Sequence, residues 1–287
     1  MISSLSLERK HILERISAWS AARPDIRALA VVGSGARVDD PADEWSDWDL
    51  LLLADEPQTY LNSEDWLGEI SQPLVSMVER GEQGQIIERR VLFRGGVDVD
   101  FIILPTADLR TFSAEPLASI LQRGICVLFD RDAVLTPQLV LVDKIPKIQP
   151  PASTEFSELI NDFLFHTVWT AKKIKRGELW TAKSCCDGYM KERLLKMIEW
   201  YTACLSAWET QTWYSGRFLE RWASPTIQQE LNGIFAHYDA DDLWLALDNT
   251  TRLFHLLGRQ TARCMNYPYP EERAGELQTP LQWIKSL

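Results

Sequence analysis

Two aspartates one residue apart, Asp47 and Asp49, are the side chains of this sequence best suited to metal chemistry. They open an apolar run at residues 50–53, which is typical of a buried β-strand. Side chains two positions apart project from the same face of a strand, which puts the Cβ atoms of the pair roughly 6–7 Å apart. Carboxylate oxygens are the ligands that Mg²⁺ prefers. The pair therefore predicts a Mg²⁺ site at the start of a strand.

A third carboxylate could complete this site from a neighbouring strand. Residues 97–104 also read as a strand, in which Asp98 and Asp100 share one face. We choose Asp100 because it directly precedes the apolar run 101–104. Three carboxylates on adjacent strands suit metal-assisted transfer, whereas without a metal they would repel one another and raise their pKa values. Asp47, Asp49 and Asp100 are thus the predicted catalytic and metal-binding residues.

A glycine-serine turn precedes these acids in the chain. Gly33 and Ser34 follow the apolar run 26–32, and a turn rich in backbone N–H groups can hold a phosphate. Gly33-Ser34 could instead form an ordinary connecting turn. Asp47 and Asp49 could instead simply cap the end of a strand. The ordered combination of turn, aspartate pair and later aspartate favours metal-assisted nucleotidyl transfer.

The elements that position these residues fill the first half of the chain. We expect helices over residues 5–22, 63–70 and 108–121, and strands over residues 26–32, 49–53, 85–93, 97–104 and 126–129. An acidic loop at residues 39–46 leads into the strand of Asp49. Three prolines in residues 142–153 indicate an interdomain connection. Beyond it, helical apolar spacing covers residues 156–175, 179–205, 226–235 and 241–264.

These patterns predict an α+β protein with two domains. A mixed sheet flanked by helices should occupy residues 1–141, a linker residues 142–153, and an all-α helical bundle residues 154–287. The length of 287 residues and the 46% of hydrophobic residues are sufficient for both cores.

Composition also restricts the cellular setting and the partners. No apolar run reaches the length of a membrane span, and the amphipathic start of the chain lacks the apolar segment of a signal peptide. Five cysteines, without C-x-x-C spacing, indicate a reducing, cytoplasmic setting with neither a disulfide framework nor a zinc site. We therefore expect a cytoplasmic protein that does not bind membranes.

Net charge is −11, and residues 39–65 hold ten acids and no Lys or Arg. This argues against a nucleic-acid partner, because a phosphate backbone needs a basic track. A negative cleft would instead concentrate a small cationic substrate, although an acidic loop that is simply solvated explains the same residues.

The motifs resemble those of the aminoglycoside 6-adenylyltransferase (streptomycin adenylyltransferase) family, within the nucleotidyltransferase superfamily that has a polymerase-β-like core. The resemblance runs over residues 5–275. Its residues are Gly33-Ser34, the segments 46–50, 99–105 and 127–132, the helical block 163–201 and the segment 267–270. The family's turn commonly reads G-S-R, whereas the arginine here is displaced to Arg37.

The resemblance implies an N-terminal nucleotidyltransferase domain that transfers AMP from ATP to a hydroxyl and releases pyrophosphate. Gly33, Ser34 and Arg37 would bind the phosphates, and Asp47 and Asp49 would bind Mg²⁺. Asp100 would be either a ligand of a second metal or the general base.

The helical domain would supply further contacts. Lys172 is the best candidate there for a phosphate contact, and Lys191 is a weaker one. Glu178, Asp187 and Glu199 could receive ammonium or guanidinium groups of the acceptor. Trp48, between the two aspartates, could stack on a substrate ring or pack in the wall of the site. Charges on a solvated helix surface are the alternative for each of these lysines and glutamates and for Asp187.

The resemblance thus indicates an antibiotic-resistance enzyme, active as a monomer or weak dimer, that adenylylates a streptomycin-like aminoglycoside. One alternative is the same transfer to another acceptor, such as a lincosamide or a protein hydroxyl. A second is a non-catalytic nucleotide-binding regulatory protein.

Overall fold

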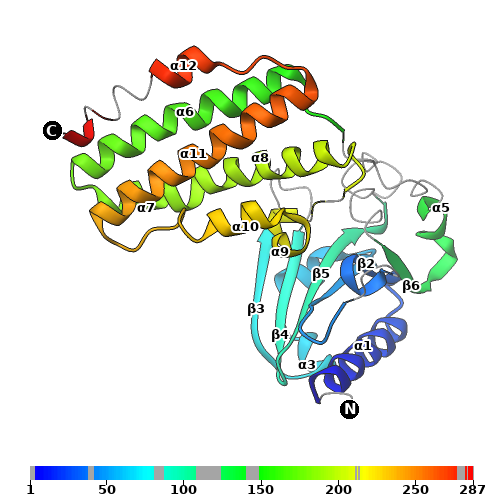
Figure 1. Cartoon of the computed structure of the whole chain (residues 1–287). Coiled ribbons are helices and arrows are strands. Elements are labelled where there is room, and N and C mark those ends of the chain that lie inside the picture. Colours follow the sequence, from blue (N-terminus) through cyan, green and yellow to red (C-terminus); the bar gives the residue numbers. More distant parts are fainter. Residues whose placement is uncertain are drawn as a thin grey trace. The chain divides into compact units, whose positions relative to one another are not determined.

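The structure is a computed structural model that describes residues 4–37, 42–80, 87–107, 124–139, 149–210, 212, 214–276, 282 and 284–286. The chain divides into two compact units, Met1–Ile145 and Pro146–Leu287. Figure 1 shows that the first unit holds the sheet and that the second is helical. The α+β fold class expected from the sequence is therefore confirmed.

A six-stranded mixed sheet is the centre of the first unit. Its strands are β1 (Ile26–Val32), β2 (Trp48–Ala54), β3 (Pro73–Arg80), β4 (Ile87–Phe93), β5 (Val97–Pro105) and β6 (Ile125–Asp130). Their order is β3-β4-β5-β2-β1-β6. The central neighbours β2 and β5 run parallel, and the other paired strands run antiparallel. The described helices of this unit are α1 (Ser4–Ala22), α2 (Pro57–Asn62), α3 (Leu67–Ile70) and α5 (Thr136–Leu139).

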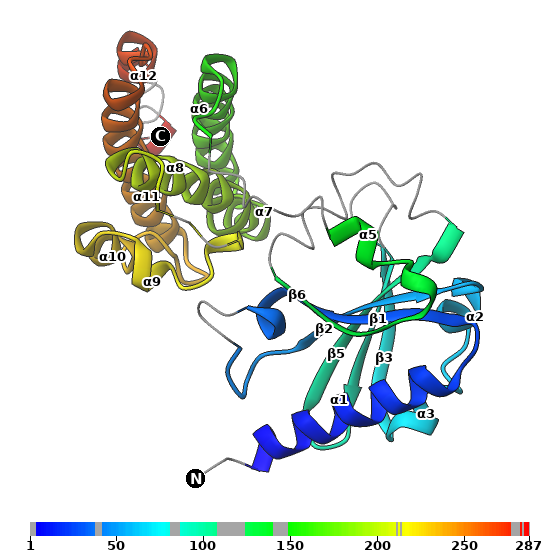
Figure 2. The same ribbon diagram turned by 90° about the vertical axis from the view of Figure 1, so that its right-hand side faces the viewer.

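The two faces of this sheet carry separate apolar clusters. Leu29 and Leu50 belong to the cluster on the face covered by α1, and Ala30 and Leu51 belong to the cluster on the opposite face. Figure 2 shows α1 on one side of the sheet and α5 on the other. Because strand side chains alternate, Asp49 projects from the face of Leu51, away from α1.

Most of the expected elements of this unit are present. The strand over residues 26–32 is confirmed to the residue, and α1 begins one residue before its expected start. β3 was not predicted, because its exposed residues show no alternation of apolar and polar side chains. The helix expected over residues 108–121 lies outside the described residues, as do residues 142–148 of the expected linker.

The second unit packs its three long helices around one apolar cluster. The described helices are α6 (Ser153–Lys175), α7 (Leu179–Ser184), α8 (Met190–Leu205), α9 (Leu219–Trp222), α10 (Pro225–Leu231), α11 (Ala240–Met265) and α12 (Glu271–Glu276). Phe163 of α6 and Phe254 of α11 stack at the centre, with ring centroids 3.7 Å apart. The helix expected over residues 179–205 is divided by a π-helical turn, Cys185–Tyr189.

A disulfide links α8 to α11, contrary to the expectation that the cysteines are all reduced. Cys204 and Cys264 are bonded, with Cα atoms 6.4 Å apart. Sixty positions separate them in the sequence, so no local spacing motif announces the pair. Only the packing of the two helix ends brings the thiols together.

In the described part of the chain, every helix is too short or too polar to cross a membrane.

Candidate active site

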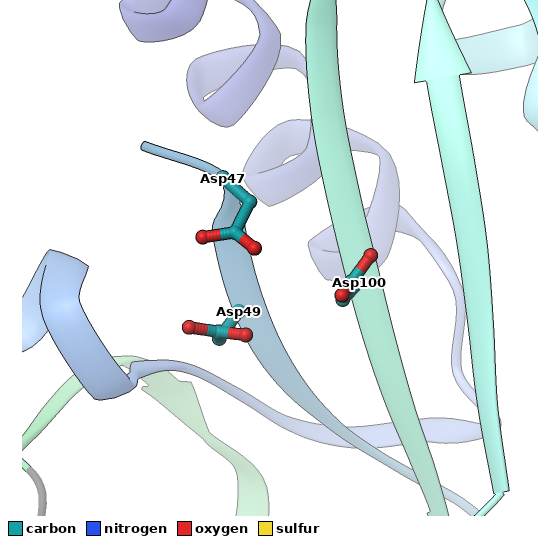
Figure 3. A group of neighbouring side chains, drawn as sticks. All are labelled: Asp47, Asp49 and Asp100. Carbon is teal, nitrogen blue, oxygen red and sulfur yellow. The ribbon is translucent and has the colours of Figure 1, made fainter. Parts of the chain in front are cut away.

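Three carboxylates meet on the central parallel strands of the sheet, and we call them the acidic trio (Asp47, Asp49 and Asp100). Asp49 of β2 lies directly beside Asp100 of β5 in the parallel register, and Asp47 precedes β2. One oxygen from each side chain lies within 4.8 Å of the other two. Figure 3 shows the three side chains facing a common space. The expected pairing of these strands is therefore confirmed.

The electrostatics of Asp100 reflect this crowding. Its side chain is only 12% exposed. The pKa of Asp100 is raised to about 7, mainly by burial; Arg90 opposes the rise, and the neighbouring Asp47 and Asp49 add to it. Arg90 of β4 places its Nε 3.3 Å from an Asp100 oxygen. A cluster that disfavours its own ionisation in this way is suited to a divalent cation, which would compensate the repulsion.

Glycine at position 33 leaves room for this cluster. Gly33 begins a 3-10 turn, Gly33–Ala36, with a φ of +66°. A Cβ atom there would lie 2.5 Å from Oδ2 of Asp49. The turn and the aspartate pair therefore approach as closely as the backbone allows, and only glycine fits.

In this turn, the Ser34 hydroxyl is available to a ligand, whereas the Gly33 N–H is not. The N–H of Gly33 donates to the carbonyl of Gly124 at 3.2 Å, so it is already engaged. The Ser34 Oγ is buried and has no hydrogen-bond partner among the described residues. A buried hydroxyl without a partner is costly and marks a place where a ligand oxygen could bind. Arg37 follows at the end of the same turn.

Trp48 points away from the acidic trio. Its indole contacts Arg9 of α1, whose guanidinium carbon lies 4.5 Å from the ring centroid. A Cβ atom on Gly35 would lie 2.8 Å from the same indole, so the ring fills the space behind the turn. In this position Trp48 packs in the wall of the site.

The two lysines named from the sequence differ in environment. Lys172 is exposed in the last turn of α6. Lys191 of α8 is directed inward: its Nζ donates to the Cys186 carbonyl at 2.8 Å and to the Thr250 hydroxyl at 2.9 Å. Burial lowers the pKa of Lys191.

Each of the three acids named in the helical unit has a cationic neighbour. Glu178, just before α7, pairs with Lys173 at 2.6 Å and with Arg176 at 2.8 Å. Asp187, in the π-helical turn, pairs with Lys183 and lies 3.8 Å from Lys191.

Glu199 of α8 lies 3.6 Å from Lys196, and burial raises the pKa of Glu199. All three acids of the helical unit are therefore partly compensated by neighbouring lysine or arginine side chains.

Sequence reasoning missed two arginines beside the acidic trio. The first is Arg90, which is paired with Asp100 across the β4–β5 ladder. The second is Arg9 of α1. Arg9 falls in the apolar stripe of α1, four residues after Leu5 and three before Ile12. A charge at a stripe position was the signal that could have identified it.

The chain resembles known proteins over most of its length. The sequence model of a family described as streptomycin adenylyltransferase matches residues 7–283. The aminoglycoside 6-adenylyltransferase of Bacillus subtilis (strain 168) is 20% identical over 257 residues, which cover 87% of this chain and 88% of that protein. That of Staphylococcus aureus is 20% identical over 272 residues, covering 91% and 93%. A crystal structure of an aminoglycoside 6-adenyltransferase from Bacillus subtilis is 17% identical, with a TM-score of 0.47 over 97% of each chain.

Proposed function

The chain belongs to the streptomycin adenylyltransferase family, and we propose that it transfers AMP from ATP to a hydroxyl of a streptomycin-like aminoglycoside, releasing pyrophosphate. The observation that carries this proposal is the acidic trio beside the Gly33–Ala36 turn. A nucleotide donor in turn implies a cytoplasmic setting. The curated relatives, whose names specify aminoglycosides, support the acceptor class.

The donor set of the acidic trio fits Mg²⁺. Three carboxylate oxygens within 4.8 Å of one another are hard ligands, and the buried Asp100 gains most from a compensating cation. When bound, Mg²⁺ supplies charge neutralisation on the triphosphate and lowers the pKa of a nearby hydroxyl.

Asp100 has two candidate roles in this scheme. As a ligand, it would complete the set begun by Asp47 and Asp49. As a general base, it would take the proton of the acceptor hydroxyl. Exchange of Asp100 for Glu would distinguish the roles, because a base role predicts a displaced pH profile for transfer.

The Gly33–Ala36 turn holds the phosphates in this proposal. The partnerless Ser34 hydroxyl donates to a phosphate oxygen of ATP, and Arg37 adds positive charge at the end of the turn. From the helical unit, the exposed Lys172 is the candidate phosphate contact. Lys191 is the weaker one, because its ammonium group already donates to Cys186 and Thr250.

The acids of the helical unit bind the cationic acceptor in this proposal. Glu178, Asp187 and Glu199 offer carboxylates to which a guanidinium can donate two parallel hydrogen bonds. Each already has a cationic partner, so the acceptor would share or replace that partner. Glu199 gains most from a second cation, because its burial disfavours the ionised form.

The chain's own residues contribute mainly by positioning. The β2–β5 register fixes Asp49 beside Asp100, and the glycine turn brings the phosphate site against them. Holding both reactants in line can supply several kcal/mol of the barrier reduction, on the order of 7–11 kcal/mol for ideal geometry.

The test is pyrophosphate release with ATP, Mg²⁺ and a panel of aminoglycosides led by streptomycin, followed by mass spectrometry of the drug. With wild type we expect pyrophosphate release and a mass gain on the drug of one adenylyl group, and with Asp49→Asn a loss of transfer rate of at least about 100-fold. Asp98→Asn is the matched control, since it removes an exposed carboxylate of β5 outside the trio.

Three outcomes would change the proposal. Near-normal turnover of Asp49→Asn would overturn the mechanism. Transfer to a lincosamide or a protein hydroxyl, with no mass gain on any aminoglycoside, would keep the mechanism and replace the acceptor. Binding of ATP without release of pyrophosphate to any acceptor would favour a regulatory nucleotide-binding role.

A further inference from the structure

Arg9 is a buried cation with an unusual set of partners. It is one of two buried arginines in the described residues, at 7% exposure, and the other is Arg89 at 3%. Burying a guanidinium is costly unless hydrogen bonds satisfy it. The partners of Arg9 therefore indicate what its burial stabilises.

These partners are main-chain groups of the segment that leads into β2. Arg9 donates from Nη1 to the Asp43 carbonyl at 2.5 Å and from Nη2 to the Asp47 carbonyl at 3.4 Å. Its guanidinium stacks on Trp48, and the Trp48 indole N–H donates back to the Arg9 carbonyl at 3.1 Å. One side chain thus holds both ends of the segment 43–48.

This segment carries a member of the acidic trio that the sheet does not hold. The β2–β5 register begins at Trp48, so the main chain of Asp47 lies outside the ladder. Residues 43–46 close on themselves: the Asp43 carboxylate accepts from the Trp45 N–H at 3.0 Å and from the Ser46 hydroxyl at 2.8 Å. Arg9 joins this small turn to α1.

Arg9 and the acidic trio lie on opposite faces of β2. Trp48 faces α1 and receives Arg9, while Asp49 projects from the opposite face. Arg9 can therefore fix the backbone of Asp47 without occupying the space in which the carboxylates meet.

We propose that Arg9 is a positioning residue for the cation site of the acidic trio, acting through the Asp47 main chain and the Trp48 ring. This inference rests on the cation-binding part of the proposed function and not on the acceptor. Its energetic logic is that of the residues that orient metal ligands, whose loss typically weakens metal affinity about 10- to 100-fold.

The test is Mn²⁺ binding to the full chain, measured as the loss of the free-ion EPR signal without nucleotide or acceptor. We expect Arg9→Met to weaken Mn²⁺ affinity about 10-fold or more. Arg9→Lys, which keeps the charge but not the two-pronged donor, should be intermediate. Arg89→Met is the matched control: Arg89 also donates to carbonyls, those of Tyr60 and Leu61, and should lower stability without changing Mn²⁺ affinity.

Kinetics provide a second measurement that general damage would not reproduce. At saturating ATP and acceptor, Arg9→Lys should raise the Mg²⁺ concentration for half-maximal pyrophosphate release and leave the rate at saturating Mg²⁺ within about threefold. A lowered maximal rate with unchanged Mg²⁺ dependence would overturn the inference. So would equal Mn²⁺ affinities of wild type, Arg9→Lys and folded Arg9→Met. If wild type binds Mn²⁺ but modifies no aminoglycoside, the proposed acceptor fails and the role of Arg9 is still decided by the binding data.

Discussion

Asp100 combines a raised pKa with an arginine contact. It is buried among like charges, which raises its pKa to about 7, and it is nevertheless in contact with Arg90. Burial, and after it the neighbouring aspartates, make its ionisation unfavourable, and Arg90 opposes them. Without a cation, the protonation of this one residue is therefore coupled to the stability of the first unit.

The sign of this coupling is fixed by the direction of the shift. Because the folded-state pKa of about 7 exceeds the ordinary value of 3.8, the folded state retains a proton that the unfolded state loses as pH rises. Metal-free wild type should lose stability between about pH 4 and pH 7, by on the order of 1.4 kcal/mol per pKa unit, and then level off. Asp100→Asn lacks this loss, so it should be the more stable protein at pH 8.

Urea unfolding of both proteins in EDTA, at pH 4.5 and pH 8, measures this difference. Adding Mg²⁺ at pH 8 should then stabilise wild type and leave Asp100→Asn nearly unchanged. A stability difference that is the same at both pH values would contradict the assigned environment of Asp100.

Gly33 gives a second prediction at the scale of one residue. Gly33→Ala places a methyl group 2.5 Å from the Asp49 carboxylate and adds strain at a positive φ. We expect a stability loss of roughly 1–3 kcal/mol and a weaker Mn²⁺ affinity. Gly68→Ala has open space and is the control; thermal unfolding and Mn²⁺ titration compare them. Equal behaviour of the two variants would show that the turn does not approach Asp49 closely.

The acidic residues of the site could be predicted because their side chains suit a metal and they lie beside apolar runs typical of strands. Asp47 and Asp49 stand out through their ordered combination with the Gly33-Ser34 turn and a later aspartate, and Asp100 because it precedes an apolar run. Arg90 did not stand out, since a single arginine on a strand normally indicates a solvated face, and Arg9 offered only the weak signal of one charge in an apolar stripe. Their roles depend on contacts with segments more than nine residues away, which no local pattern contains.

The elements follow the same rule. β1, β2 and β5 were predictable because burial on both faces makes them continuous apolar runs. β3 was missed because it is an edge strand whose Leu74, Val75 and Met77 are exposed, so no face is selected for polarity. The π-helical turn before α8 was missed because it is a single five-residue turn within an otherwise helical segment.

The packing of α11 against α6 gives a prediction at the scale of elements. Phe254→Ala removes the partner of Phe163 from the centre of the helical unit and should cost about 3–5 kcal/mol of stability. Leu245→Ala, on the same helix but 56% exposed, should change stability by less than about 0.5 kcal/mol. Thermal unfolding followed by circular dichroism separates the two. A small effect of Phe254→Ala would mean that this stacking is not central to the unit.

At the scale of the whole molecule, the apolar clusters do not mix. The two clusters of the sheet lie in the first unit, and the large helical cluster lies in the second. The acidic trio belongs to the first unit alone. We therefore expect each unit to have its own free energy of unfolding, and only the first unit to be stabilised by a bound cation.

Calorimetry tests this division. We expect two unfolding transitions, of which Mn²⁺ raises only one, by an amount that Asp49→Asn abolishes. Phe254→Ala should lower the other transition. A single transition that responds as a whole to both changes would show that the units unfold together.

The strand order also sets a schedule for synthesis on the ribosome. β1 needs β6 as its outer neighbour, and β6 is translated about a hundred residues later. Asp100 is synthesised about fifty residues after Asp49. At ordinary rates of synthesis, the strands of these two residues can therefore pair only some seconds after Asp49 has been added. The sheet closes only when residue 130 has left the exit tunnel, while the helical unit is still being made. A premature stop in the second half would therefore release a fragment that already holds the complete acidic trio.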